Sequence, residues 1–244
     1  MKIKITLTTL SAIVALAMMP IFAFSQNDST ANAPENFSTW SVTQNMGLTL
    51  NSADNDIAPV ASPSGLSLYF TSNRSGGQGL NDIYVSQRLT LSSAWGAPQN
   101  LGATVNTRSV EVAASFSLDG REMFLQSMRP GGMGGNDLYI STRTDPNNDF
   151  GWTATANLGA VINTAFAESS AFYFEDLTNG VNTLIFASDR NGADPQLFQS
   201  TRNANGTFNA PTPITELNGA MTAQLRPAIR RDGLEILFGS VRLG

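Results

Sequence analysis

The sequence predicts an all-β protein, a β-propeller of about four-stranded blades with three complete blades and an incomplete fourth. Two observations carry this prediction. One pattern recurs at nearly constant spacing, and its apolar runs are too short for helices and are bounded by turn signals. A single small sheet cannot bury both of its faces, so radial stacking is favoured. A β-sandwich is the alternative, although it would not require a repeat in strict register.

The repeat units start near residues 40, 95, 152 and 208. Each opens with an aromatic residue, and the intervals between these residues are 55, 57 and 56 positions. Asn-Met-Gly or Asn-Leu-Gly follows each Trp, and an acidic residue follows later in the unit. The opening residues are Trp40, Trp95, Trp152 and Phe208. Because the Trp residues occupy one fixed position per unit, we expect them to pack between blades rather than to stack on sugars.

Each unit then contains two short strands joined by a Gly turn, a Ser-x-Arg motif, a Gly-rich loop and a third strand. The apolar runs fit strands that are buried on both faces. They are Leu68-Tyr69-Phe70, Met123-Phe124-Leu125, Leu184-Ile185-Phe186 and Ile236-Leu237-Phe238. The glycine loops 75–81 and 130–136 lie between strands, which favours tight turns over phosphate cradles, since a phosphate loop precedes a helix. We expect a fourth strand to open at the next Trp.

This pattern resembles the WD40-like β-propeller repeat of TolB-type proteins. The residues that carry the resemblance in unit two are Trp95, Asn100-Leu101-Gly102, Ser117-x-Asp119-Gly120, Ser127-x-Arg129 and Asp137-Leu138-Tyr139. Unit three departs from it by an insertion near 176–182 and by Gln196 in place of the Asp. The resemblance implies a propeller, and it implies a periplasmic or secreted protein in which the propeller is a binding module. Family members resemble one another in fold more than in activity.

Residues 1–25 read as a signal peptide, with Lys2 and Lys4 before an apolar stretch and a cleavage site at Ser25/Gln26. An uncleaved anchor helix is the alternative, which Pro20 disfavours. Residues 26–39 form a polar, flexible leader and residues 40–244 the propeller repeats. After cleavage no membrane span is expected, and the protein is periplasmic or secreted.

The fourth unit stops after its second strand. The segment at Trp40 could supply the outermost strand that closes the ring, but the third strand, an Asp-Leu-Tyr run, has no counterpart in this unit. Exposed strand edges invite pairing or aggregation. The sequence therefore suggests a truncated reading frame or a fragment of a longer propeller.

Composition limits the chemistry. The chain has no Cys and no His, which excludes disulfides, thiol nucleophiles, Ser-His-Asp triads and His-ligated zinc. The formal net charge is −5 and no Lys/Arg-rich run occurs, so we expect no nucleic-acid partner. The side chains that remain available for chemistry are carboxylates, Tyr and Arg. Paired carboxylates for glycoside hydrolysis could come from Asp56, Glu111 and Glu168, although their equivalent positions favour strand capping instead.

Two candidate binding sites follow from the motifs. The Arg residues that close the second strands could form a ring that binds anionic groups, or they could pair within each blade, Arg74 with Asp82 and Arg129 with Asp137. The ring would consist of Arg74, Arg129, Arg190 and Arg242.

The second candidate is a calcium site at Asp145, Asn147 and Asp149, whose oxygen ligands alternate as in calcium loops. The following Gly151 is one position late, and an Asx-rich turn is the alternative. Apart from calcium we expect no cofactor.

The sequence therefore predicts a non-enzymatic binding or scaffold module of the cell envelope that engages a protein or a polysaccharide through its loops. The alternative is a carbohydrate-active or lactonase-type propeller enzyme that uses carboxylates.

Overall fold

The computed structural model describes residues 4–5, 42–192, 194–218 and 223–241. Within these ranges the protein is all-β, and no helix is present that could cross a membrane. The predicted leader and all of the predicted signal peptide except Lys4–Ile5 lie outside the described residues, as does Trp40.

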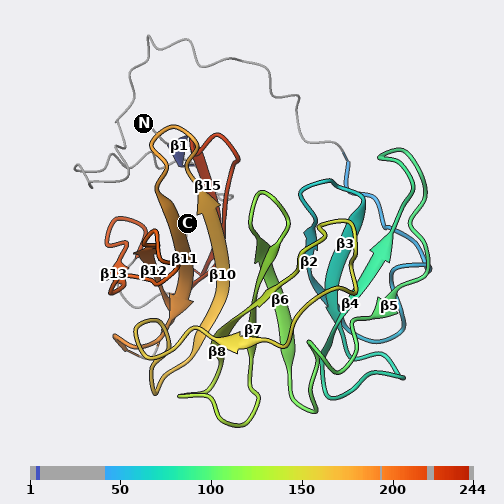
Figure 1. Ribbon diagram of the computed structural model, residues 1–244, viewed down its shortest axis with the longest axis horizontal. Coiled ribbons are helices and arrows are strands. Elements are labelled where there is room, and N and C mark those ends of the chain that lie inside the picture. The colour runs from blue at the N-terminus through green and yellow to red at the C-terminus, as the bar shows by residue number, and fades with distance from the viewer. Residues whose placement is uncertain (1–3, 6–41, 193, 219–222, 242–244) are drawn as a thin grey trace.

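Three four-stranded antiparallel sheets form the complete blades, and each is a meander in chain order (Figure 1). Blade 1 contains β2 (Asp56–Ala61), β3 (Ser67–Ser72), β4 (Asp82–Gln87) and β5 (Gln99–Asn100). Blade 2 contains β6 (Glu111–Phe116), β7 (Glu122–Ser127), β8 (Asp137–Thr142) and β9 (Ala156–Asn157). Blade 3 contains β10 (Glu168–Glu175), β11 (Asn182–Ser188), β12 (Gln196–Thr201) and β13 (Thr212–Pro213). The outermost strands are two residues long and start four residues after the aromatic residue, which itself lies outside any strand.

The fourth sheet contains β14 (Gln224–Ile229), β15 (Glu235–Ser240) and the two-residue strand β1 (Lys4–Ile5). Its order is β1-β15-β14, with β14 antiparallel and β1 parallel to β15. Residues 42–47, which follow Trp40, form no strand and pair with no sheet. The ring closure expected from this segment is therefore not seen in the described residues.

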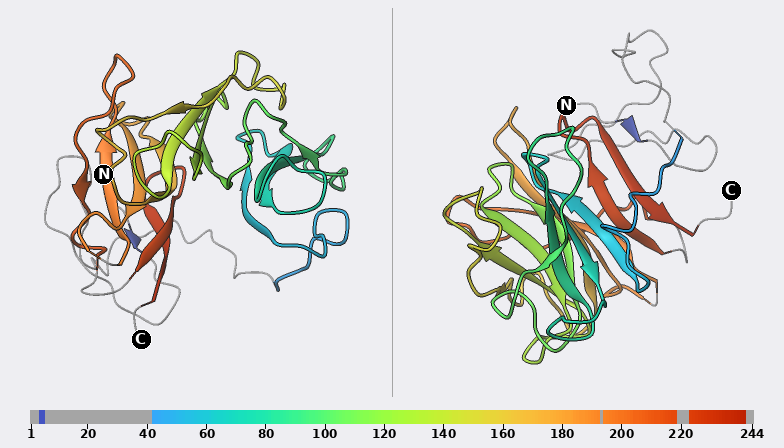
Figure 2. Two further views of the ribbon diagram at one scale, coloured as in Figure 1. Left: turned by 90° about the horizontal axis from the view of Figure 1, so that it is seen from below. Right: turned by 90° about the vertical axis from the view of Figure 1, so that its right-hand side faces the viewer.

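The four sheets follow one another around an arc and make a β-propeller (Figure 2). The first strands of the sheets, β2, β6, β10 and β14, are the innermost and contact one another in succession. Among the described residues, no strand of blade 1 contacts β14 or β15. The arc is thus open between its first and its last sheet.

Each large hydrophobic cluster is shared by two adjacent sheets. Blades 1 and 2 meet through Tyr69, Ile83 and Val85 on one side and Met123, Leu125 and Tyr139 on the other. A second cluster joins blades 2 and 3 and a third joins blade 3 to the fourth sheet. The predicted apolar runs lie in β3, β7, β11 and β15, and their side chains are buried apart from the partly exposed Leu68 and Leu237.

Glycine is required where loops from neighbouring blades meet. Gly134, in the loop after β7, approaches the segment that precedes β10 so closely that a Cβ would lie 2.0 Å from the Phe166 carbonyl oxygen. In the preceding interface, a Cβ on Gly79 would lie 2.3 Å from the Thr107 carbonyl oxygen. The glycine loops therefore bring blades together, which agrees with the interpretation of turns rather than phosphate cradles.

Each innermost strand contains a β-bulge two to four residues after its start. In β2, β10 and β14 the bulge places a residue other than glycine in the left-handed region: Ala58 (φ 50°), Ser170 (φ 55°) and Arg226 (φ 54°). Such residues cost about 1–2 kcal/mol each, so the surrounding ladder must impose this conformation.

Candidate functional site

An acid–arginine pair recurs at the inner end of every complete blade. The acid is the first residue of the innermost strand, and the Arg follows the second strand. The N–O distances are 2.6 Å for Arg74–Asp56, 3.4 Å for Arg129–Glu111 and 3.1 Å for Arg190–Glu168. Arg242, the fourth Arg of the predicted ring, lies outside the described residues.

The three described guanidinium groups are held by their own blades. Arg74 donates to the Leu50 carbonyl at 2.8 Å and lies over the rings of Phe70 and Tyr84. Arg129 and Arg190 bond to the equivalent carbonyls and lie over the equivalent rings. Each Arg therefore joins an acid, a loop carbonyl and an aromatic side chain, and this arrangement stabilises the blade.

The predicted pairing of Arg74 with Asp82 and of Arg129 with Asp137 is wrong. Both Asp side chains are buried and accept hydrogen bonds from the glycine loop and from an Asn of the outermost strand. Asp137 accepts the Met133 amide at 2.6 Å and the Asn157 amide group at 2.9 Å. A loop rich in glycine has free backbone N–H groups, and these donate to the carboxylate at the start of the next strand.

The candidate calcium residues do not converge on one point. Asp145 caps a turn by accepting the Asn147 amide at 2.9 Å, whereas Asp149 is buried between blades 1 and 2. The Asp149 carboxylate accepts bonds from Ser67 and Tyr69 at 2.6 Å each, from Gln87 at 2.7 Å and from Arg143 at 2.9 Å. The described residues contain no group of three or more acidic side chains placed to hold a metal ion.

Burial alone would raise the pKa of Asp149, but the bonds from Ser67, Tyr69, Arg143 and Gln87 together lower it. The ring of Trp152 lies under the Arg143 guanidinium at 4.3 Å, so Trp152 belongs to the same interface. This network was not predicted from the sequence. The signal that could have revealed it is the second series of arginines, Arg88, Arg143 and Arg202, which end the third strands and lie over Trp95, Trp152 and Phe208.

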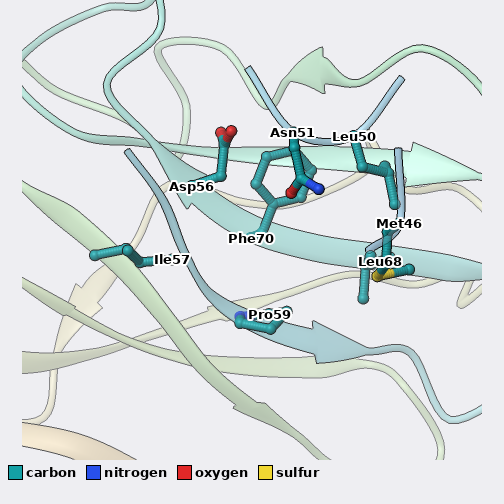
Figure 3. A pocket seen from close by; sticks show the side chains of 8 residues that line it. All are labelled: Met46, Leu50, Asn51, Asp56, Ile57, Pro59, Leu68 and Phe70. Atoms are coloured by element: carbon teal, nitrogen blue, oxygen red, sulfur yellow. The ribbon is translucent and has the colours of Figure 1, made fainter. Parts of the chain in front are cut away.

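Asp56 differs from the other two acids of the repeat. The side chains of Glu111 and Glu168 are 0 % exposed, whereas that of Asp56 is 10 % exposed. Asp56 also borders a hollow of about 90 Å³ on the open face of blade 1 (Figure 3). The hollow is lined by Met46, Leu50, Asn51, Asp56, Ile57, Pro59, Leu68 and Phe70.

Repetition explains why the hollow is open. The residues equivalent to its apolar lining in blade 2 are covered by the face of blade 1. These residues are Leu101, Val105, Met123 and Leu125. No described residue covers blade 1 in the same way, because the arc begins there.

Burial alone would raise the pKa of Asp56. The bonds from Arg74, from the amide and hydroxyl of Ser52 and from Ser72 outweigh that effect and lower the pKa to about 2. Asp56 is thus an ionised carboxylate at the edge of an apolar hollow, next to the amide of Asn51. This arrangement combines a hydrogen-bond acceptor, an amide and an apolar floor.

No family model matches the sequence, and no curated protein is significantly similar to it. Solved structures with a similar fold include an alpha-L-arabinofuranosidase from Podospora anserina, with a TM-score of 0.47 and 14 % identity over 76 % of this chain and 63 % of that one. An endo-arabinase from Bacteroides thetaiotaomicron gives 0.46 and 14 % over 71 % and 65 %. A GH62 alpha-L-arabinofuranosidase from Coprinopsis cinerea gives 0.44 and 16 % over 76 % and 63 %.

The chain spans less than two-thirds of the length of each of these structures. The prediction that the protein is not an enzyme is withdrawn, since each of these three structures is of an enzyme. The absence of His and Cys excludes Ser-His-Asp triads and His-ligated zinc, but it does not exclude every hydrolytic mechanism. Glycoside hydrolysis needs only carboxylates, and this chain has them.

Proposed function

We propose that the protein is an exported, carbohydrate-active β-propeller that holds a saccharide at the hollow beside Asp56. One observation carries the proposal. Of the three equivalent acids of the repeat, Asp56 alone combines solvent exposure with a position at the edge of a hollow. A repeated residue whose surroundings differ in one copy can take a role that the other copies cannot.

The lining suits one face of a sugar. Figure 3 shows Phe70 beside Asp56 and Asn51, with Pro59 and Leu68 further along the hollow. Apolar side chains would cover the C–H face of a sugar ring, while the carboxylate and the amide would bond to its hydroxyl groups. A volume of about 90 Å³ corresponds to about three water molecules. The hollow would therefore hold part of one ring, and a longer glycan would extend into solvent.

The ionisation of Asp56 limits its role. A carboxylate with a pKa of about 2 does not donate a proton near neutral pH, so Asp56 would act as a hydrogen-bond acceptor, a base or a nucleophile. A hydrolytic reaction would need a second carboxyl group as the acid. Asp54, which is exposed and two residues away, is the nearest candidate in the sequence.

The location and the substrate class belong to the same proposal. The N-terminal stretch with the features of a signal peptide and the resemblance to TolB-type repeats support export to the periplasm or the medium. An envelope or extracellular polysaccharide is then the ligand class to test first.

The test is binding and turnover on a panel of polysaccharides, oligosaccharides and lactones. Asp56→Asn should abolish both, since the amide loses the negative charge at the hollow. Asp54→Asn is the control for binding. Met46→Trp, which would enlarge an exposed side chain that lines the hollow and lies ten residues from Asp56, should block binding while leaving the thermal midpoint unchanged. Wild-type behaviour of Asp56→Asn and Met46→Trp on a bound substrate would overturn the proposal, and so would the lack of any ligand in the panel.

A further inference from the structure

Exposed apolar side chains gather at the end of the propeller where the innermost strands begin. The second strands end and the third strands begin at this same end, so the glycine loops lie there beside the segments that precede the innermost strands. Four large apolar residues of these loops and segments are about half exposed or more: Leu80 (66 %), Met128 (51 %), Met133 (45 %) and Phe166 (50 %). None of them lines the hollow beside Asp56.

At the junction of blades 1 and 2, backbone hydrogen bonds attach Leu80 and Met128 to one short segment. The Leu80 amide donates to the Ser109 carbonyl at 3.1 Å. The Met128 amide donates to the Val110 carbonyl, also at 3.1 Å. The positions of both residues are therefore fixed by their backbones, while more than half of each side chain stays exposed.

At the junction of blades 2 and 3, Met133 and Phe166 are brought together in the corresponding way. The Gly135 amide donates to the Phe166 carbonyl at 3.1 Å, a bond equivalent to that of Leu80 at the first junction. Met133 precedes Gly134, whose backbone approaches the Phe166 carbonyl too closely for a side chain. One loop, residues 128–136, thus carries two of the exposed residues and contacts a third.

The other copies of the repeat show that the fold does not require apolar side chains at these positions. The equivalent residues are Asn73 for Met128, Gln78 for Met133, Ser109 for Phe166 and Gly135 for Leu80. The backbone bonds are the same in both sets. The amides of Gln78 and Met133, for example, both donate to the Asp that opens the next strand. Packing within the propeller therefore does not account for the apolar side chains.

Arg108 adds a positive charge to the same region. It lies next to Ser109, in the segment to which Leu80 and Met128 are attached, and it is exposed. Among the described residues, its guanidinium group has no acidic partner. The equivalent residues before blades 1 and 3 are Ala53 and Ala165, so this charge, like the apolar side chains, belongs to one place in the repeat.

We propose that the loop surface, formed by Leu80, Arg108, Met128, Met133 and Phe166, binds a polypeptide segment of a partner protein. The segment carries an aromatic side chain and a carboxylate. Exposed apolar residues that gather on one face mark interaction surfaces, and the flexible, polarizable side chain of Met adapts to aromatic groups. The carboxylate pairs with Arg108. A polypeptide fits better than an anionic lipid surface, which the formal net charge of −5 would repel.

The experiment uses the full chain to select binders from a library of random linear peptides displayed on phage. Selected peptides should combine an aromatic residue with Asp or Glu, and calorimetry with synthetic copies gives their Kd. A variant with Met128→Asn, Met133→Gln and Phe166→Ser together should weaken binding at least about tenfold. Each new residue is the one found at the same position one blade earlier, so this triple variant should keep the wild-type thermal midpoint.

Two matched controls change exposed side chains elsewhere. Leu89→Asn combined with Leu177→Asn, in the loops after β4 and β10 at the opposite end of the strands, should bind the peptides like the wild type. Arg108→Ala should weaken binding at least about threefold and make it less dependent on salt. Arg231→Ala, which removes an exposed Arg from the turn between β14 and β15, should leave binding unchanged.

The proposal is overturned if the library yields no peptide, or if the selected peptides bind the triple variant as tightly as the wild type. It is also overturned if phosphatidylcholine vesicles bind the wild type but not the triple variant, because the loop surface then binds a lipid. Saccharide binding at the hollow should be the same in all these variants, since none of the changed residues lines it. The loop surface and the hollow are thus tested separately.

Discussion

At the scale of single residues, Asp149 and Asp145 have different roles: Asp149 is a buried structural carboxylate, whereas Asp145 is exposed. Both were candidates for one metal site. Asp149 instead joins two blades through Tyr69 of one and Arg143 of the other, and both the carboxylate and the guanidinium are almost inaccessible to solvent. A buried charge of this kind is tolerated because every partner is present, and removing one partner leaves the other uncompensated.

We therefore predict that Asp149→Asn lowers the free energy of unfolding by about 3 kcal/mol at pH 7. The folded-state pKa of Asp149 lies below its ordinary value of 3.8, so its contribution is complete above that value and is lost as the pH falls toward the folded-state pKa. Urea unfolding at pH 7 and at about pH 3 should show the gap between wild type and variant narrowing in acid.

The matched control is Asp145→Asn. Its amide oxygen can still accept the Asn147 N–H, so its stability should stay within about 0.5 kcal/mol of the wild type. A loss for Asp149→Asn no greater than for this control would contradict the role assigned to the buried network.

At the scale of elements, the glycine loops couple one blade to the next. The Gly135 amide donates to the Phe166 carbonyl at 3.1 Å, and Gly134 lies against the same segment without room for a side chain. The loop after β7 thus belongs to the interface with blade 3 as much as to blade 2.

Gly134→Ala should consequently destabilise the protein by more than about 2 kcal/mol, because the new Cβ would overlap backbone that is fixed at the start of β10. Gly192→Ala is the control, since a methyl group added there would have no neighbour within 4 Å and its φ is not in the left-handed region. Its effect should stay within about 0.5 kcal/mol. Equal denaturation midpoints for the two variants would refute the close-approach argument.

These elements also show what could be read from the sequence. The strands were predictable because turn glycines and apolar runs recur in register, and a local pattern determines a local structure. The partners of Asp149 could not be predicted from the sequence. Tyr69 is 80 residues away from Asp149, and only the packing of two sheets brings the two residues together. The Arg pairing failed for a related reason. Arg74 lies closer in sequence to Asp82, but the strand order places it beside Asp56.

The candidate hollow was beyond sequence reasoning as well. Asp56 occupies the same repeat position as Glu111 and Glu168, and the exchange of Glu for Asp does not by itself indicate a more exposed carboxylate. Its exposure depends on the absence of a covering blade in the described arc, which is a property of the assembled sheets.

At the scale of the whole molecule, the sheets of the arc differ in how many of their faces are covered by a neighbouring sheet. Blades 2 and 3 are covered on both faces, whereas blade 1 and the fourth sheet each have one face without a neighbouring sheet in the described residues. Local stability should follow this order, since opening an end sheet breaks one interface and opening an inner sheet breaks two.

Hydrogen exchange should therefore be slowest for the amides of β7 and β11 and at least about tenfold faster for β3 and β15. Mass spectrometry of peptides from each strand would measure this order. Uniform protection across the four sheets would show that the ends are covered in solution, by another chain or by ring closure.

The sharing of each core by two sheets has a consequence for how such a chain can change over evolution. Each sequence repeat forms one sheet. Each hydrophobic core, in contrast, lies between two sheets and takes its side chains from both of them. Duplication or exchange of a whole repeat keeps every strand ladder intact. It also brings together two sheet faces that did not evolve in contact with each other. Compatibility between neighbouring faces, rather than the quality of any single sheet, then decides which recombined chains fold.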